Sequence, residues 1–99
     1  EPFGPLVPIL TFKTFDEVIE RANDNDLGLC SYLYTNSMDK AHIGSEKLES
    51  GCVAVNTGVV AIAEAPFGGI KQTGYGREGG SGAIKDYLNV KYTHMGLKI

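Results

Sequence analysis

The sequence lacks three features, each of which would point to a class of protein. Its net charge of -3 provides no basic surface for nucleic acid or for an anionic membrane. No apolar run is long enough to cross a bilayer, and no signal peptide is visible. The cysteines and histidines follow no metal-ligand spacing. We therefore expect no nucleic-acid partner, no membrane partner and no metal site.

Cysteine is scarce, and the two that occur, Cys30 and Cys52, each stand at the head of an apolar stretch. Their surroundings resemble neither a zinc site nor a disulfide framework, so we interpret them as small buried hydrophobic residues, with a reactive thiol as the alternative. Such cysteines fit a reducing compartment, and we expect a cytoplasmic protein. His42 and His94 have no triad or metal partner in the sequence and are expected on the surface.

The length of the chain allows at most one small domain with a modest core. Its 99 residues are 42% hydrophobic and 21% charged, as in an ordinary globular protein. The chain opens with Glu1 rather than with Met, and an apolar run follows almost at once. We therefore expect residues 1–99 to form a single partial domain of a longer protein. Because such a domain would leave strands without partners, we expect the isolated chain to be marginally stable or self-associating.

The first half of the chain alternates between strand and helix patterns. Residues 6–12 are β-prone, but Pro8 restricts them to an edge or irregular strand. Thr14 and Glu17 form a capping box that begins a helix, and Gly28 is its expected stop. Residues 30–35 read as a strand, and a second helix is expected from a cap at Ser37 to about residue 50, with Gly51 as its stop.

The second half begins with residues 52–56, a short apolar run typical of a strand covered on both faces. Residues 59–65 fit either a strand or a loop, and residues 82–87 fit a helical turn. Leu88, Val90 and Tyr92 alternate with polar residues, which predicts a final strand with one buried face. This order predicts an α/β fold with a mostly parallel sheet flanked by helices.

A glycine-dense segment is the most informative part of the sequence, because seven of the 13 glycines fall between Pro66 and Gly82. Aromatic and charged residues interrupt it, which predicts a long ordered loop held against a site rather than a flexible spacer. Residues 74–79 match G-x-G-x-x-G, but only 20 residues follow, too few for the strand and helix of a dinucleotide fingerprint. Lys71, Arg77 and Glu78 are expected to hold the loop by hydrogen bonds to its backbone.

Three segments in the same order resemble the C-terminal part of the aldehyde dehydrogenase superfamily. Residues 1–5, EPFGP, are similar to its E-x-F-G-P signature, and Val55-Asn56 to the V-N at the end of a core strand. Residues 66–78 resemble its P-F-G-G-x-K-x-S-G-x-G-R-E signature, with Thr73 in place of the serine. Residues 55–58, the run APFGGIK and the closing residues 86–92 look most like succinate-semialdehyde dehydrogenases.

The resemblance implies an enzyme that oxidises an aldehyde to a carboxylic acid with NAD or NADP as cofactor. In that family a cysteine thiolate attacks the carbonyl, and a glutamate activates the water that hydrolyses the thioester. Both residues lie upstream of this segment, so no residue here is assigned a catalytic role and the isolated chain is expected to be inactive. The implied partners are the remainder of the parent enzyme, an aldehyde substrate and further copies of the same subunit.

Five residues match family positions at the cofactor and the substrate. Glu1 matches the glutamate that accepts hydrogen bonds from the nicotinamide ribose, and Phe3 the aromatic beside the nicotinamide ring. Val59 and Ala61 fall in the loop that lines the substrate tunnel, and Phe67 matches an aromatic at the substrate pocket. Each of three residues also has a structural alternative. Glu1 could be an exposed terminal acid, Phe3 a core aromatic, and Phe67 an aromatic that anchors the loop.

Two departures leave other functions open. Related succinate-semialdehyde enzymes often carry a serine at the position of Ala61, and alanine cannot donate a hydrogen bond to the distal carboxylate of the substrate. An aldehyde dehydrogenase for a different aldehyde is therefore the first alternative. The lack of an assigned nucleophile motivates the second, a non-catalytic interaction module. Residues 83–99 are similar to the segment with which the family joins a neighbouring subunit, where an exposed strand edge is useful.

Overall fold

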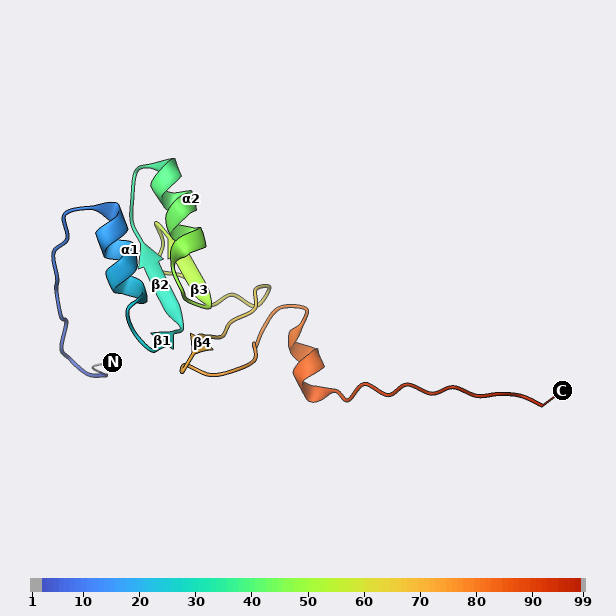
Figure 1. The fold of residues 1–99 in the computed structure, drawn as a ribbon. Helices are drawn as coiled ribbons and strands as arrows, with labels where there is room; N and C mark the ends of the chain where they lie inside the picture. Colours follow the sequence, from blue (N-terminus) through green and yellow to red (C-terminus); the bar gives the residue numbers. More distant parts are fainter. Residues whose placement is uncertain (1–2, 99) are drawn as a thin grey trace.

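The computed structural model describes residues 3–98 as a small α/β body with a long C-terminal tail (Figure 1). Its elements, in chain order, are α1 (Phe15–Asn23), β1 (Leu27–Gly28), β2 (Cys30–Leu33), α2 (Met38–Lys47), β3 (Cys52–Val55), β4 (Ile70–Lys71) and the 3-10 helix η1 (Ala83–Tyr87). Glu1, which carries one of the cofactor predictions, lies outside the described residues. No helix in the part described is long and apolar enough to cross a membrane.

Strands β2 and β3 form the centre of the body as a parallel pair, in register from Cys30 opposite Cys52 to Leu33 opposite Val55. Helix α2 packs against both strands, and α1 packs against α2. Gly44 permits this close approach, because a Cβ atom there would lie 2.5 Å from Leu33 Cδ2. The sequence therefore predicted the β-α-β unit correctly, including its parallel pairing.

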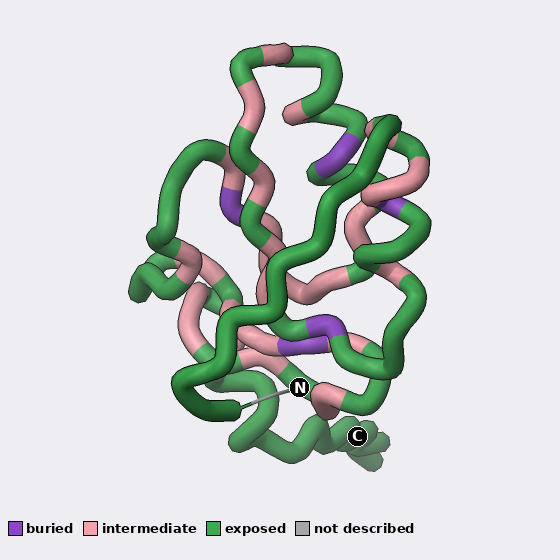
Figure 2. The backbone as a smooth tube through the Cα atoms, turned by 90° about the vertical axis from the view of Figure 1, so that its left-hand side faces the viewer, coloured by how far each residue is buried: buried purple, intermediate pink, exposed green. Residues whose placement is uncertain are grey.

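The core is small, and Figure 2 shows that few of the described residues are buried. Ile19 of α1 and Ala54 of β3 are the buried hydrophobic residues in the described part of the chain. β3 is only half-buried at Cys52, Val53 and Val55, so the expectation that both of its faces are covered is wrong for this chain by itself. Large apolar side chains stay exposed instead of adding to the core, which supports the expectation of marginal stability.

Both helices begin at the residues that the sequence predicts. The Glu17 N–H donates to Thr14 Oγ1 over 3.2 Å, and Glu17 Oε2 accepts from the Lys13 N–H over 2.8 Å. Ser37 caps α2 through the Lys40 N–H. The helix ends were predicted less well, because α1 ends at Asn23 and α2 at Lys47, before the expected glycine stops.

Gly28 and Gly51 have other uses than ending helices. Gly28 belongs to β1, which pairs antiparallel with β4 in a contact that the sequence did not predict. A Cβ atom on Gly51 would lie 1.8 Å from Gly68 O, so this glycine lets the glycine-dense loop touch the start of β3. One parallel and one antiparallel pair replace the mostly parallel sheet that was predicted.

The predicted first and last strands are absent from the described residues. Residues 6–12 and 88–93 lie in extended backbone without strand pairing, and residues 59–65 form a loop. Leu88, Val90 and Tyr92 are exposed by 61%, 102% and 85%, so the face that was predicted to be buried is open. A strand needs a neighbour for its backbone hydrogen bonds and its apolar face, and no other described segment lies beside the tail (Figure 1). The helical turn after the glycine-dense loop was predicted correctly as η1.

Candidate functional site

Asn56 holds together the carboxyl ends of β2 and β3. The Thr35 N–H donates to Asn56 Oδ1, and Asn56 Nδ2 donates to the Thr35 carbonyl, each over 2.9 Å. Asn56 adopts a positive φ of 56°, a conformation that asparagine tolerates better than most residues. The side-chain amide of Asn56 thus continues the hydrogen bonding between the two strands just beyond their last residues. In open α/β sheets, ligands bind beyond the carboxyl ends of parallel strands, which makes this edge a candidate site.

The loop of residues 57–65 leaves from this edge and contains two of the predicted substrate residues. Val59 is 63% exposed and lies beside a hollow of about 230 Å³, together with Cys52, Ile62 and Pro66. Ala61 is also exposed. The Val59 N–H donates to Thr57 Oγ1 over 3.2 Å, which gives the beginning of the loop a defined turn. Both side chains are therefore open to contact with a ligand or with another part of a larger protein.

Phe67 is half-buried, and its backbone is fixed at the mouth of the glycine-dense loop. Its N–H donates to the Glu78 carbonyl over 2.7 Å, and its carbonyl accepts from the Glu78 N–H over 2.8 Å. Its side chain borders a hollow of about 410 Å³ that also includes Leu29, Tyr75 and Tyr87. This double hydrogen bond closes the loop and fixes the backbone from which the Phe67 side chain projects.

Arg77 braces the loop from within. Its Nη1 donates to the carbonyls of Gly69 and Gly76 over 2.8 and 2.7 Å, which confirms the predicted structural role. Gly68 allows the two sides of the loop to meet, because a Cβ atom there would lie 2.6 Å from Gly76 O. The loop is ordered because its carbonyls accept hydrogen bonds from Arg77 and its glycines allow two parts of its backbone to approach closely.

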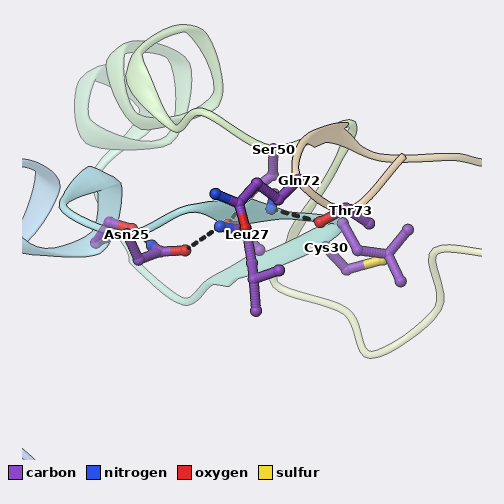
Figure 3. Close-up of a pocket in the computed structure, with 10 residues that line it drawn as sticks. Asn25, Leu27, Cys30, Ser50, Gln72 and Thr73 are labelled. Carbon is purple, nitrogen blue, oxygen red and sulfur yellow. Dashed lines mark hydrogen bonds between the residues drawn. The ribbon is translucent and has the colours of Figure 1, made fainter. Parts of the chain in front are cut away.

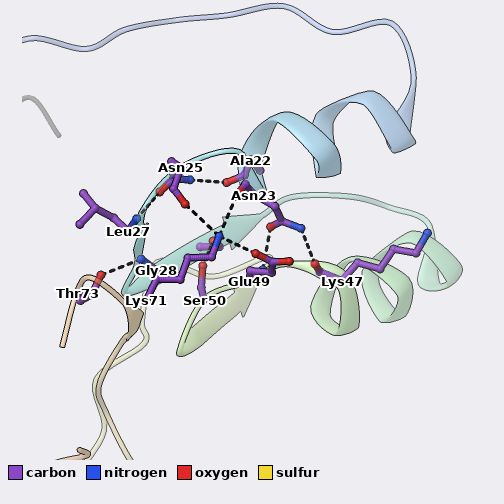
Figure 4. Close-up of polar contacts among 11 residues, drawn as sticks. Ala22, Asn23, Asn25, Leu27, Gly28, Lys47, Glu49, Ser50, Lys71 and Thr73 are labelled. Atoms are coloured by element: carbon purple, nitrogen blue, oxygen red, sulfur yellow. Dashed lines mark hydrogen bonds and ion pairs between the residues drawn. The ribbon is translucent and has the colours of Figure 1, made fainter. Parts of the chain in front are cut away.

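Lys71 and Glu78 stabilise the loop differently from the prediction. Lys71 Nζ reaches out of the loop to the carbonyls of Asn23 and Asn25, over 2.9 and 3.1 Å, and to Glu49 Oε2 over 2.6 Å. Glu78 contributes its backbone rather than its carboxylate. The sequence identified both as structural residues but did not show that Lys71 joins the loop to α1 (Figure 4).

The structure does not gather the predicted site residues into one pocket. Phe3 is 98% exposed, and Val59 and Phe67 border different hollows. A larger hollow of about 640 Å³, part of which Figure 3 shows, contains none of them. It is lined by Ala22, Asn25, Leu27, Gly28, Leu29, Cys30, Ser31, Ser50, Gln72 and Thr73. A complete site would need further walls around these open surfaces.

The two cysteines lie opposite each other on β2 and β3 and are half-buried, not buried as predicted. Cys52 Sγ lies 3.9 Å from the Gly68 carbonyl, to which its thiol donates. Burial, together with the neighbouring Cys52 thiol, raises the pKa of the Cys30 thiol above its usual value. Within residues 3–98, no group of three or more His, Cys, Asp and Glu side chains could hold a metal ion.

Asn56 and Thr35 form a contact at the candidate site that the sequence did not predict. The Val55-Asn56 pair was noted as a family-like motif, but its amide clamp was not foreseen. An asparagine directly after a short apolar strand is the signal that could have indicated a turn with positive φ. Its partner Thr35 is distant in sequence, so no local pattern identifies the pairing.

Comparison with protein families and known proteins gives one consistent result. The model of the aldehyde dehydrogenase family matches residues 1–93. The chain is 49% identical over 96 residues to a 3-sulfolactaldehyde dehydrogenase of Pseudomonas putida, covering 97% of this chain and 20% of that protein. It is 46% identical over 97 residues to an NADP-dependent succinate-semialdehyde dehydrogenase of Escherichia coli, covering 98% of this chain and 20% of that protein.

A solved structure shows the same similarity in three dimensions. The NAD⁺ complex of an aldehyde dehydrogenase from Bacillus cereus superposes with a TM-score of 0.86 at 45% identity. The superposition covers 90% of this chain and 18% of the Bacillus chain. The chain thus spans about a fifth of the length of the curated relatives it matches.

Proposed function

The chain belongs to the aldehyde dehydrogenase family, and we propose that it is part of an enzyme that oxidises succinate semialdehyde to succinate with NAD or NADP. The observation that carries this proposal is the braced loop around Phe67, beside the exposed loop that leaves the Asn56 clamp. The braced loop holds an aromatic residue beside an exposed loop. Together they are suited to form one wall of a ligand site whose other walls come from other segments of the enzyme.

The proposed cofactor contacts come from the N-terminal segment. Phe3 is 98% exposed, so its flat apolar face is available to a nicotinamide ring supported from its other side by the rest of the enzyme. The carboxylate of Glu1 would accept hydrogen bonds from the ribose hydroxyls, a role that suits its several acceptor sites. A bound cofactor would accept the hydride, and these residues would hold its nicotinamide ribose in place.

The proposed substrate contacts come from Val59, Ala61 and Phe67. Val59 and Phe67 supply apolar surface for the short carbon chain of a semialdehyde, and the backbone bridge to Glu78 keeps Phe67 in position. Ala61 is exposed and adds no hydrogen-bond donor. The distal carboxylate would therefore be bound chiefly by residues of the enzyme outside this chain.

The nucleophile is proposed to lie elsewhere in the parent enzyme. A catalytic cysteine needs a lowered pKa so that its thiolate is present at neutral pH. Cys30 has a raised pKa instead, and the Cys52 thiol donates to the Gly68 carbonyl of the glycine-dense loop. The chain would contribute walls and cofactor contacts, in a cytoplasmic homo-oligomer whose neighbouring subunit covers the exposed residues 88–93.

Ala61 provides the sharpest test of this proposal in the full-length parent enzyme. Ala61→Ser would add a hydroxyl that can donate to the distal carboxylate, so we expect KM for succinate semialdehyde to fall by up to about tenfold, or about 1.4 kcal/mol. Ala63→Ser, on the same exposed loop, is the matched control and should leave KM unchanged. If the two variants behave alike, Ala61 does not face the substrate.

A second candidate is an enzyme of the same family that acts on a different anionic aldehyde. The alanine at position 61 favours it, as does the 49% identity to a protein named for 3-sulfolactaldehyde, whose distal anion is a sulfonate. Steady-state kinetics of the parent with both aldehydes would decide between them. If kcat/KM is higher for the sulfonated aldehyde, that aldehyde and not succinate semialdehyde is the substrate. Inactivity on every aldehyde would refute the enzyme proposal altogether.

A further inference from the structure

The parallel pairing of β2 and β3 brings the two cysteines of the chain together. Cys30 and Cys52 are directly opposite residues at the beginning of the two strands. Neighbouring strands lie about 4.8 Å apart, which falls within the range of Cα separations that disulfides span. Side chains alternate between the two faces of a strand, so residues in register on parallel strands point to the same face. Both cysteines are free thiols.

From this geometry we propose that Cys30 and Cys52 form a reversible dithiol–disulfide pair, with a low-molecular-weight disulfide such as glutathione disulfide as the oxidant. The Cys30 thiolate attacks one sulfur of the oxidant, forms a mixed disulfide and releases one thiol. The Cys52 thiolate then attacks the Cys30 sulfur and releases the second thiol. The protein loses two protons and two electrons, and the oxidant is reduced to two thiols.

The surroundings assign the two roles. Cys30 lines the 640 Å³ hollow, and Figure 3 shows its sulfur among the lining residues, whereas Cys52 borders the smaller hollow of 230 Å³. Cys30 is therefore the thiol with more room for a small oxidant. Its raised pKa keeps its thiolate fraction low at neutral pH, so the first attack should be faster in alkaline buffer. Cys52 lies further toward the glycine-dense loop, with its thiol directed to the Gly68 carbonyl. Formation of the disulfide removes the Cys52 proton and with it this contact, so oxidation would leave the Gly68 carbonyl next to Phe67 without its thiol donor.

The proposal is tested by mapping the cross-link in the full-length parent protein. The protein is incubated with glutathione disulfide, free thiols are blocked with N-ethylmaleimide, and the tryptic peptides are identified by mass spectrometry. Cleavage after Arg21, Lys40, Lys47 and Lys71 places the two cysteines in different peptides, residues 22–40 and 48–71. We expect these two peptides to be joined and to separate after reduction with dithiothreitol.

Two variants make the test specific. Cys52→Ser removes the resolving thiol, so Cys30 should be recovered as a stable mixed disulfide with glutathione. The double variant Cys30→Ser/Ser31→Cys keeps both thiols but moves one to the opposite face of β2, and it should form no link to Cys52.

The wild-type result alone can overturn the proposal, even if a variant fails to fold. The proposal is wrong if both cysteine peptides from the folded protein carry only N-ethylmaleimide while the same oxidant links them after unfolding in urea. The readout is a covalent link and does not involve aldehyde oxidation, so it stands or falls separately from the proposed activity.

Discussion

Lys71 Nζ lies 2.6 Å from Glu49 Oε2 and joins three segments that are far apart in the sequence. The same ammonium group donates to the carbonyl of Asn23, the last residue of α1, and to that of Asn25 just beyond it (Figure 4). A cation is favoured at the carboxyl end of a helix, where the last carbonyls lack partners. Lys71 also has a positive φ of 55°, so its backbone is held in a conformation that lysine seldom adopts.

Replacing Lys71 should cost more stability than replacing Glu49. Lys71→Met leaves the two carbonyls and the carboxylate without their donor, for an expected loss of about 1–3 kcal/mol in the free energy of unfolding. Glu49→Gln removes only the charge of a side chain that is 54% exposed, which should cost below about 1 kcal/mol. Urea unfolding of the parent protein measures both. Equal losses would show that the ion pair, not the carbonyl contacts, stabilises this junction.

Gly51 should be intolerant of any side chain. A Cβ atom there would lie 1.8 Å from the Gly68 carbonyl oxygen, so Gly51→Ala must displace the glycine-dense loop or the start of β3. We expect a loss of about 3 kcal/mol or more in stability. Gly58→Ala is the matched control, since nothing lies within 4 Å of a Cβ atom at that position, and it should stay within about 0.5 kcal/mol of the wild type. A mild effect at Gly51 would contradict the close approach of the two segments.

Replacing Asn56 should lower the stability of the fold for two separable reasons. Asn56→Gly loses the amide contacts with Thr35 but retains freedom for the positive φ, whereas Asn56→Ala loses both. The free energy of unfolding should therefore fall by about 1–3 kcal/mol for glycine and by about 1 kcal/mol more for alanine. Thermal unfolding of the two variants provides the comparison. If alanine were tolerated as well as glycine, the positive φ would not constrain this position.

Acid should weaken the beginning of α1. The Lys13 N–H donates to Glu17, and this contact, with further help from Thr14 and Arg21, lowers the pKa of the Glu17 carboxyl below its ordinary value of 4.5. A group whose pKa is lower in the folded state stabilises that state above its unfolded pKa. That contribution is lost as the pH falls from 4.5 through the folded pKa.

The acid effect can be isolated with Glu17→Gln, which keeps a hydrogen-bond acceptor but does not titrate. Circular dichroism of the wild type should show a loss of helix in this pH range that the variant lacks. An identical acid response in both proteins would assign the effect to other carboxylates.

The isolated chain should associate through its exposed tail. Leu88, Val90 and Tyr92 alternate on extended backbone that lacks a strand partner in the described part of the protein. Sedimentation velocity of residues 1–99 should show mass that rises with concentration, whereas residues 1–87 should associate less. A monomer with a sharp, concentration-independent unfolding transition would contradict this expectation.

The sequence by itself determined the features that depend on neighbouring residues. The caps at Thr14 and Ser37 could be predicted because each side chain bonds to an N–H three residues away. The strands at Cys30 and Cys52 could be predicted from short apolar runs, and the parallel pairing from the helix between them. The motifs that indicate the aldehyde dehydrogenase family are likewise contiguous in the chain.

Only the tertiary structure decided the contacts between distant segments. The β1–β4 pairing, the clamp of Asn56 on Thr35 and the reach of Lys71 to α1 each join residues that no local pattern relates. The same reason explains the wrong strand predictions at residues 6–12 and 88–93. An apolar, β-prone composition or an alternating pattern shows that a segment can pair, but a strand forms only where a neighbouring backbone supplies the hydrogen bonds, and the described chain supplies none there.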